Sequence, residues 1–306
     1  WSKVGLDAPP SRVFHSMAAT SNGILLHGGI ATADAASAFD DTWRWNGTGW
    51  QKVAGATQAG QRYGASMAEH APSRRIFMFG GTMGGTRVVS NELWEFAAEK
   101  WTQVAAPPLT VARTGTAMAY DNARSQLLLF SGELATQTVT PETDTFDGTS
   151  WTNRTPPPMP SPRQSASAVF DPLQGRVVMF GGANGSTRLN ETWTFDGATW
   201  VQQFPATRPT KRALAAIAYD VDRKRALLFG GRDIVDNDET WAWDGGQWTM
   251  ITNTGPAARR AAAMAYDSQR HRLVLFGGQT GLVRSNETWE FDGTHWIDRT
   301  PTSTSG

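Results

Sequence analysis

A segment of about fifty residues occurs six times along this 306-residue chain. Each copy has an arginine followed by small residues, then an apolar run that ends in a glycine pair in five of the copies, and finally a tryptophan. The closing tryptophans are Trp50, Trp101, Trp151, Trp200, Trp248 and Trp296. Repetition at this period is typical of propellers, solenoids and arrays, in which each copy forms one structural unit.

The local pattern within each copy predicts a four-stranded antiparallel sheet. Four apolar runs, too short for helices, are separated by turn residues, and pairs such as Asp147-Gly148 favour a tight hairpin before the last run. Side chains are small in the first run (residues 64–68 in the second copy) and large in the last two, where the tryptophans lie. Since the space between sheets that radiate from an axis widens outward, the first run belongs at the hub. We therefore predict an all-β fold, a six-bladed β-propeller.

The whole of 1–306 is predicted to form a single β-propeller domain. The expected blades span approximately residues 10–53, 60–104, 111–154, 161–203, 210–251 and 257–299. Residues 1–4 copy the fourth strand of a blade, so we expect them to form an extra strand that pairs with the last blade and closes the ring.

The composition excludes several classes of function. Lysines and arginines (28) balance aspartates and glutamates (28), so the chain has no overall field that would attract nucleic acid. The absence of cysteine excludes disulfides, thiolate catalysis and thiolate metal sites. No apolar segment approaches the ~18 residues of a membrane span. We predict no nucleic-acid partner, no membrane span, no metal site and no cofactor.

The order of these motifs resembles the kelch-repeat β-propellers, a family that includes the central domain of galactose oxidase. An apolar strand, a glycine pair and a strand with one tryptophan about six residues before another are that family's pattern, and they cover the whole chain. The third copy departs from it, with Ser131-Gly132 in place of the pair and Asp144 in place of a tryptophan. The pairs are Gly28-Gly29, Gly80-Gly81, Gly181-Gly182, Gly230-Gly231 and Gly277-Gly278.

A ring of arginines is the main candidate for a binding site. In a four-stranded blade, the entry to strand one and the loop from strand two to strand three share a face. We expect the guanidinium groups at these entries to gather around one channel mouth and bind an anion through bidentate pairs. Arginines at similar positions contact ligand carboxylates in kelch propellers that bind acidic peptides, so the resemblance implies the same. The alternative is that they hydrogen-bond carbonyls of adjacent blades. The predicted ligand-binding residues are Arg12, Arg62, Arg113, Arg163, Arg212, Arg259, Asn184, Arg232 and Gln279.

A few departures from the repeat provide candidates for catalysis. His15 and His27 replace, in the first copy, residues that are mostly alanine and phenylalanine in the others. The candidate catalytic residues are His15 or Glu133 as the acid or base, with Tyr63 assisting and the arginines holding the substrate. The copper oxidases that share the kelch ring need a tyrosine crosslinked to cysteine, so that activity is excluded.

The predicted function is a recognition module that binds an anionic or carbohydrate-like ligand, or an acidic segment of a partner, at the arginine-lined mouth. One alternative is a hydrolase or epimerase that acts on a carboxylated sugar, and another is a scaffold for protein–protein interaction with no small-molecule site. Because the sequence begins at Trp1, we expect a trimmed or processed chain, and we expect a soluble monomer exported from a bacterium.

Overall fold

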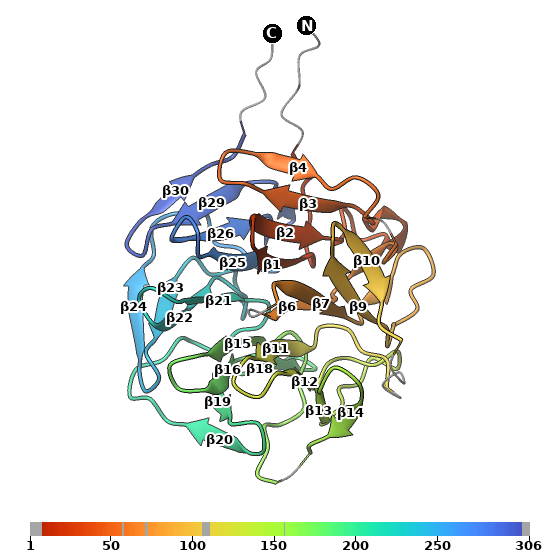
Figure 1. The fold of residues 1–306 in the computed structure, drawn as a ribbon. Coiled ribbons are helices and arrows are strands. Elements are labelled where there is room, and N and C mark those ends of the chain that lie inside the picture. Colours follow the sequence, from red (N-terminus) through yellow and green to blue (C-terminus); the bar gives the residue numbers. More distant parts are fainter. Residues whose placement is uncertain (1–7, 57, 71–72, 106–110, 156, 302–306) are drawn as a thin grey trace, which may run out of the picture.

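Six four-stranded antiparallel sheets surround a central axis in the computed structural model, which describes residues 8–56, 58–70, 73–105, 111–155 and 157–301 (Figure 1). This confirms the predicted six-bladed propeller. The strands of each sheet follow one another from hub to rim. They are β1 (Ser16–Thr20), β2 (Gly23–His27), β3 (Thr42–Trp45) and β4 (Trp50–Lys52); β6 (Ser66–His70), β7 (Arg75–Phe79), β9 (Leu93–Ala97) and β10 (Lys100–Gln103); β11 (Ala117–Asp121), β12 (Gln126–Phe130), β13 (Thr143–Phe146) and β14 (Trp151–Asn153); β15 (Ser167–Asp171), β16 (Arg176–Phe180), β19 (Thr192–Phe195) and β20 (Trp200–Gln203); β21 (Ala216–Asp220), β22 (Arg225–Phe229), β23 (Thr240–Trp243) and β24 (Trp248–Thr252); β25 (Ala263–Asp267), β26 (Arg272–Phe276), β29 (Thr288–Phe291) and β30 (Trp296–Asp298).

The core consists of apolar layers between neighbouring sheets. Between the second and third blades, for example, Ala68 and Phe77 of one sheet pack with Met118 and Leu129 of the next. Alternation of side chains along each strand sends Met118 toward the second blade and Ala119 toward the fourth. Small residues at the hub and tryptophans near the rim fill the wedge between blades, as the sequence predicted.

Tryptophans of the fourth strands also bond the blades together. The indole of Trp200 donates to Oγ1 of Thr143 in the preceding blade at 3.0 Å, and both residues are buried. The third blade breaks the pattern, because Leu93 of the second blade replaces the threonine that would accept from Trp151. The other bonds of this kind are Trp50 to Thr288, Trp101 to Thr42, Trp248 to Thr192 and Trp296 to Thr240.

A belt of backbone hydrogen bonds encircles the channel just before the hub strands. One residue from each blade donates its amide to the carbonyl of the matching residue in another blade, at 2.8–3.3 Å, and all six have left-handed φ between 53° and 68°. The bond from Phe14 to Ala261 joins the first blade to the last. The members of this backbone belt are Phe14, Gly64, Gly115, Ser165, Leu214 and Ala261. The belt thus closes the ring through the main chain.

In each of the six four-stranded sheets, all four described strands come from one copy of the repeat. The extra strand predicted at residues 1–4 lies outside the described residues.

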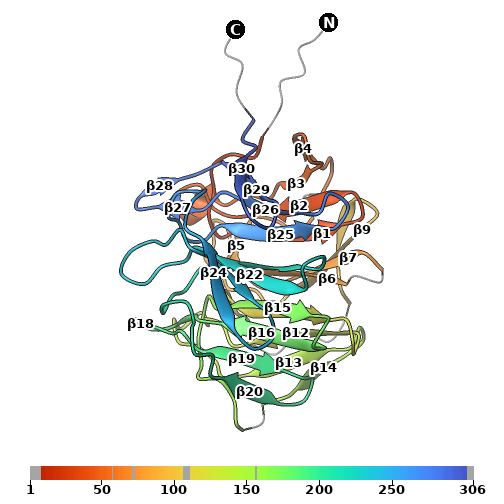
Figure 2. The ribbon, with the colours of Figure 1, turned by 90° about the vertical axis from the view of Figure 1, so that its left-hand side faces the viewer.

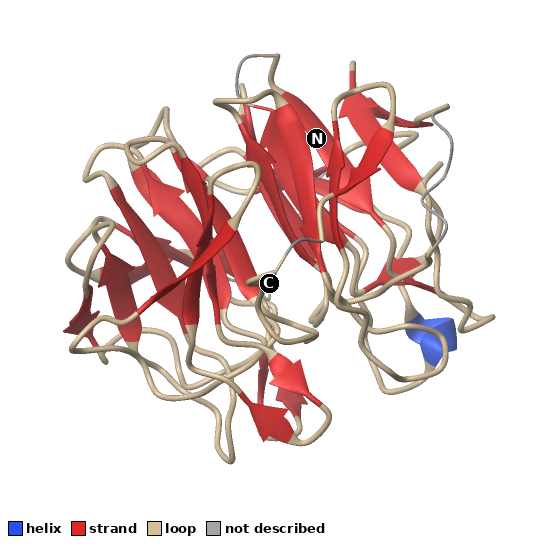
Figure 3. Cartoon of the chain, turned by 90° about the horizontal axis from the view of Figure 1, so that it is seen from below, coloured by secondary structure: helices blue, strands red, loops and turns tan. Residues whose placement is uncertain are grey.

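The two ends of the channel differ. The loop face carries the entries to the hub strands and the connections between second and third strands. The entry to β6 contains the short strand β5 (Arg62–Tyr63), and the connections include the 3₁₀ turn η1 (Ala35–Ser37) and the short strands β8 (Thr82–Met83), β17 (Ala183–Asn184), β18 (Thr187–Arg188), β27 (Gln279–Thr280) and β28 (Val283–Arg284). Strands β18, β27 and β28 lie on the left of Figure 2, with β27 and β28 above β18, and η1 lies on the lower side of Figure 3. The opposite, hairpin face carries the turns between first and second strands. Within the described residues, no helix has the length and apolar character needed to cross a membrane.

Candidate functional site

Each repeated arginine lies inside its own blade and is bound on several sides. In the fourth blade, Nη1 of Arg163 donates to the Gly181 carbonyl at 3.0 Å, and Nη2 donates to Glu191 at 2.6 Å. The indole of Trp193 donates to the same oxygen of Glu191 at 3.0 Å. One carboxylate therefore joins the entry of the hub strand to the third strand. We call this arrangement the Arg–carboxylate–Trp network.

The network recurs around the ring. The six arginines are each at most 2% exposed, and each pairs with a carboxylate of its own blade. In the third blade Asp144 replaces the tryptophan, and Arg113 binds both Asp144 and Glu142. The other pairs are Arg12 with Asp41, Arg62 with Glu92, Arg212 with Glu239 and Arg259 with Glu287.

The glycine pairs complete this framework. The amide of Gly81 donates to the Arg113 carbonyl of the next blade at 3.0 Å. Gly80 has φ of 68°, and a Cβ there would lie 2.4 Å from the same carbonyl oxygen, so a side chain cannot fit. The arginine and glycine motifs of the sequence are thus parts of one connection between blades.

The pKa values of the paired glutamates reflect this environment. Burial alone raises the pKa of Glu191, but hydrogen bonds from Arg163 and Trp193 and the charge of Arg163 outweigh it, and the net pKa lies below the ordinary 4.5. The pKa values of Glu92, Glu239 and Glu287 are lowered by the same balance. These carboxylates are ionised at neutral pH and neutralise the arginines.

The expectation that the six guanidinium groups gather around a channel mouth therefore needs correction. Arg12, Arg62, Arg113, Arg163, Arg212 and Arg259 lie at the loop face as predicted, but their charged ends point into the blades and are already paired. Bringing one of them to the surface would leave a half-buried carboxylate and a buried carbonyl without a partner, which is costly. The structural alternative raised from the sequence is closer, since the arginines serve the framework, but the carbonyls that their side chains bind belong to their own blades and not to adjacent ones.

The other predicted ligand residues do lie on the loop face. Asn184 is exposed in β17, and the backbone of Arg232 forms a β-bridge with that of Ala213. The side-chain amide of Gln279 in β27 donates to the Gly281 carbonyl at 2.7 Å. Arg232 also lines an open hollow of about 550 Å³ with Arg188 and Arg260. The remaining lining residues are Leu214, Gly281 and Leu282.

This hollow combines positive charge with exposed apolar side chains. Asp236 binds Arg260 at 2.6 Å and lies 3.7 Å from Arg232, so one carboxylate serves two arginines. Arg188 donates to the Gly185 carbonyl and forms no ion pair with any described residue. Large exposed apolar residues adjoin the hollow on two connections of the loop face: Ile234, Val235, Leu282 and Val283, each at least 71% exposed. We call the hollow and these side chains the arginine patch.

The candidate catalytic residues are not assembled into a site. His15 packs edge-on against Phe276 of the sixth blade, whereas His27 faces Trp101 of the second, so the two histidines lie on opposite sides of their blade. Burial, reinforced by nearby arginines, lowers the pKa of both histidines to about 3. Tyr63 packs beside Val13, Ile30 and Ala261.

Glu133 lies in the third blade, apart from His15 in the first and Tyr63 in the second, and its backbone pairs with Thr114 and Val139. Within the described ranges, no hydrogen bond or ion pair joins His15, Tyr63 and Glu133. No group of three or more His, Cys, Asp or Glu side chains in those ranges is placed to hold a metal ion.

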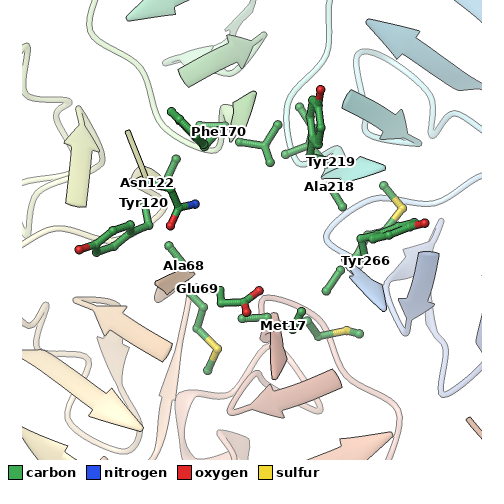
Figure 4. Close-up of a pocket in the computed structure, with 18 of the residues that line it drawn as sticks. Met17, Ala68, Glu69, Tyr120, Asn122, Phe170, Ala218, Tyr219 and Tyr266 are labelled. Carbon is green, nitrogen blue, oxygen red and sulfur yellow. The ribbon is translucent and has the colours of Figure 1, made fainter. Parts of the chain in front are cut away.

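The channel widens toward the hairpin face. Near the backbone belt it holds only a small hollow of about 170 Å³, lined by Phe14, His15 and mostly small residues. Farther along the channel, where the hub-strand methionines line its wall, it opens into a cavity of about 500 Å³, which we call the hairpin-face cavity (Figure 4). Its wall includes Tyr120, Phe170, Tyr219 and Tyr266, each from a different blade. This cavity was not predicted.

These features define the protein as a kelch-type β-propeller, a ring in which the repeated arginines, glycine pairs and tryptophans hold the blades together, with departures in the third copy. Residues 64–256 match the family model described as the KLHDC2/KLHL20/DRC7 Kelch-repeats domain. Since the match covers more than half of the chain, the chain belongs to the kelch-repeat family, and its fold fits a protein-interaction or recognition module. A comparison with curated protein sequences found no match.

Proposed function

We propose that this propeller recognises an acidic segment of a partner protein at the arginine patch on the loop face. The observation that carries the proposal is the grouping of Arg188, Arg232 and Arg260 around one hollow beside exposed Leu282. Guanidinium groups bind carboxylates in bidentate geometry, and apolar side chains next to them supply contact area. A partner segment with acidic and apolar residues fits both features.

The electrostatics favour an anion. Asp236 balances one of the three arginines that line the hollow, and Arg188 has no carboxylate among its described contacts. Lys211 and Asp233 at the edge of the patch lie 3.7 Å apart and offset each other. The hollow therefore keeps a positive excess that a partner carboxylate would neutralise.

The exposed apolar residues favour a protein over a small anion. Ile234 and Leu282 are 80% and 92% exposed, and contiguous apolar surface rimmed by charge is typical of protein interaction sites. Arginine is also enriched at the energetic centre of such interfaces. We further propose that the protein acts as a monomer outside the cell, since the arginine patch is formed by one chain.

Selection from a random peptide library, followed by affinity measurement on the enriched peptides, tests this function. Enriched peptides should combine Asp or Glu with Leu, Ile or Phe, and Arg188→Ser with Arg232→Ser should weaken their binding at least tenfold. Arg87→Ser is the matched control, because Arg87 is exposed on the loop-face connection of the second blade, outside the hollow. Enrichment without acidic residues, or equal losses for Arg87→Ser, would refute the proposal. Binding of glycans but no peptides would refute it as well.

A further inference from the structure

The hairpin-face cavity lies at the opposite end of the ring from the arginine patch, and one position of the repeat shapes its wall. Seven residues after the repeated arginine, four copies carry an aromatic residue that lines the cavity. These residues are Tyr120, Phe170, Tyr219 and Tyr266. The first two copies depart from the rule, with Ala19 and Glu69 at the same position. In the first blade the aromatic side chain is therefore replaced by a recess at Ala19, and in the adjacent second blade by the carboxylate of Glu69.

The direction of the polar groups separates Glu69 from the tyrosines. In Figure 4 the hydroxyls of Tyr120, Tyr219 and Tyr266 point away from the middle of the opening. The hydroxyl of Tyr266, for example, donates to Asp222 at 2.5 Å. The tyrosines thus present ring carbons to the cavity, while Glu69 presents an acid. Methionines and alanines of the hub strands supply most of the remaining wall.

Glu69 is held by a partner that water also reaches. Its Oε1 accepts from Nη1 of Arg74 at 2.8 Å, and the two side chains are 19% and 46% exposed. Burial raises the pKa of Glu69, and the hydrogen bond and charge of Arg74 oppose that rise. No described residue donates to Oε2 of Glu69. Arg74 also lines the cavity, but its exposed ion pair with Glu69 contributes little by itself, so a ligand cation can share Glu69 through Oε2 or displace Arg74 toward solvent at small cost.

We propose that the hairpin-face cavity binds a small organic cation, an ammonium group on an apolar body, with Glu69 as its anionic partner. The volume of about 500 Å³ lies within the range of small-molecule sites. The wall is mostly apolar and contributes burial, while its two charged residues, Glu69 and Arg74, pair through Oε1 of Glu69, so Oε2 is the acceptor left for a ligand cation to orient on. The recess at Ala19 provides the space that a tyrosine occupies in other blades.

Three probes of similar shape and different charge test this site by isothermal titration calorimetry: 2-phenylethylammonium, 2-phenylethanol and phenylacetate. The ammonium should bind most tightly. Glu69→Gln should weaken the ammonium at least tenfold and leave the alcohol unchanged, because it removes the charge and keeps the shape. Ala19→Tyr should weaken both, since it fills the recess.

Two further variants make the test specific. Asp222→Asn removes another acid from the hairpin face, and it should not change ammonium affinity because Asp222 does not line the cavity. Glu69→Tyr introduces the tyrosine that three other blades carry at this position. The variant should therefore unfold at the same temperature as the native chain but no longer bind the ammonium probe. Equal binding of the three probes, or wild-type affinity in Glu69→Gln, would overturn the proposal. The pair Glu69–Arg74 would then be an ordinary hairpin ion pair.

Discussion

Replacing Arg163 by methionine tests whether this arginine stabilises the framework of the blade or binds a ligand. The substitution keeps an apolar side chain in the blade and removes the guanidinium group. Four hydrogen bonds are lost: to the carbonyl of Ser161 at 2.8 Å, to its hydroxyl at 2.9 Å, to the Gly181 carbonyl at 3.0 Å and to Glu191 at 2.6 Å. Glu191 keeps only the indole of Trp193 as a described side-chain partner.

The expected cost follows from the exposure of the two partners. Breaking a buried ion pair costs about 3–5 kcal/mol, since the remaining charge is left without a partner. The Arg163 side chain is fully buried but that of Glu191 is 31% exposed, so water solvates part of the orphaned carboxylate. We therefore expect a loss near 3 kcal/mol. At about 2 °C per kcal/mol for a large domain, Tm should fall by about 6 °C.

Urea denaturation followed by tryptophan fluorescence measures this loss, with Arg188→Met as the control in the same blade. Arg188 lies at the surface and forms no ion pair among the described residues, so its replacement should change stability by less than about 0.5 kcal/mol. If Arg163→Met kept full stability and lost peptide binding, the guanidinium would be a ligand group and the network would be wrongly described.

The pH dependence of the same variant provides a second check. The folded-state pKa of Glu191 is lowered, so its contribution is fully present above the unfolded value of about 4.5. That contribution is lost as pH falls from there through the folded pKa. The stability difference between the native chain and Arg163→Met should therefore narrow below pH 4.5. A difference that stayed constant down to pH 3 would contradict the assignment.

Two further predictions concern buried polar groups. The double variant His15→Ala with His27→Phe should reduce the dependence of the unfolding free energy on pH between pH 6 and pH 5. In the native chain both histidines stay neutral when folded but bind a proton when unfolded below pH 6.5, so each one lowers the unfolding free energy by about 1.4 kcal/mol per pH unit as the pH falls. An unchanged slope of the unfolding free energy against pH, measured by urea titration, would contradict this. Thr143→Val should destabilise the ring by about 1–3 kcal/mol, because the buried indole of Trp200 loses its acceptor. An unchanged urea midpoint would show that the indole finds another partner.

The fold could be predicted because the repeat constrains it six times over. Strand lengths, turn pairs and the increase in side-chain size from residues 64–68 outward all require one radial arrangement, and tertiary packing enforces it in every blade. The arginine site could not be predicted in the same way. A repeated arginine at a strand entry has the same sequence signature whether its guanidinium faces solvent or a carboxylate inside the blade.

A signal for the internal partner was nevertheless present. An acid stands two residues before the third-strand tryptophan, as in Glu191 and Trp193, or before its replacement Asp144, in every copy. An arginine and an acid repeated together indicate an internal ion pair. Glu69 could also have been found, as the single acid at a position that is otherwise aromatic or alanine. Arg188 and Arg260 could not, because their approach to Arg232 depends on the shapes of three separate loops.

The backbone belt has a consequence for how this molecule can change over time. The amides and carbonyls of the belt are hydrogen-bonded between neighbouring blades, so the main chain sets the width of the channel at this point. Exchanging side chains there changes that width little. The wider mouth and the outer loops, by contrast, are built from replaceable side chains. Mutation can therefore retune the two ends separately, and an ancestor with one specificity could acquire another without giving up the first.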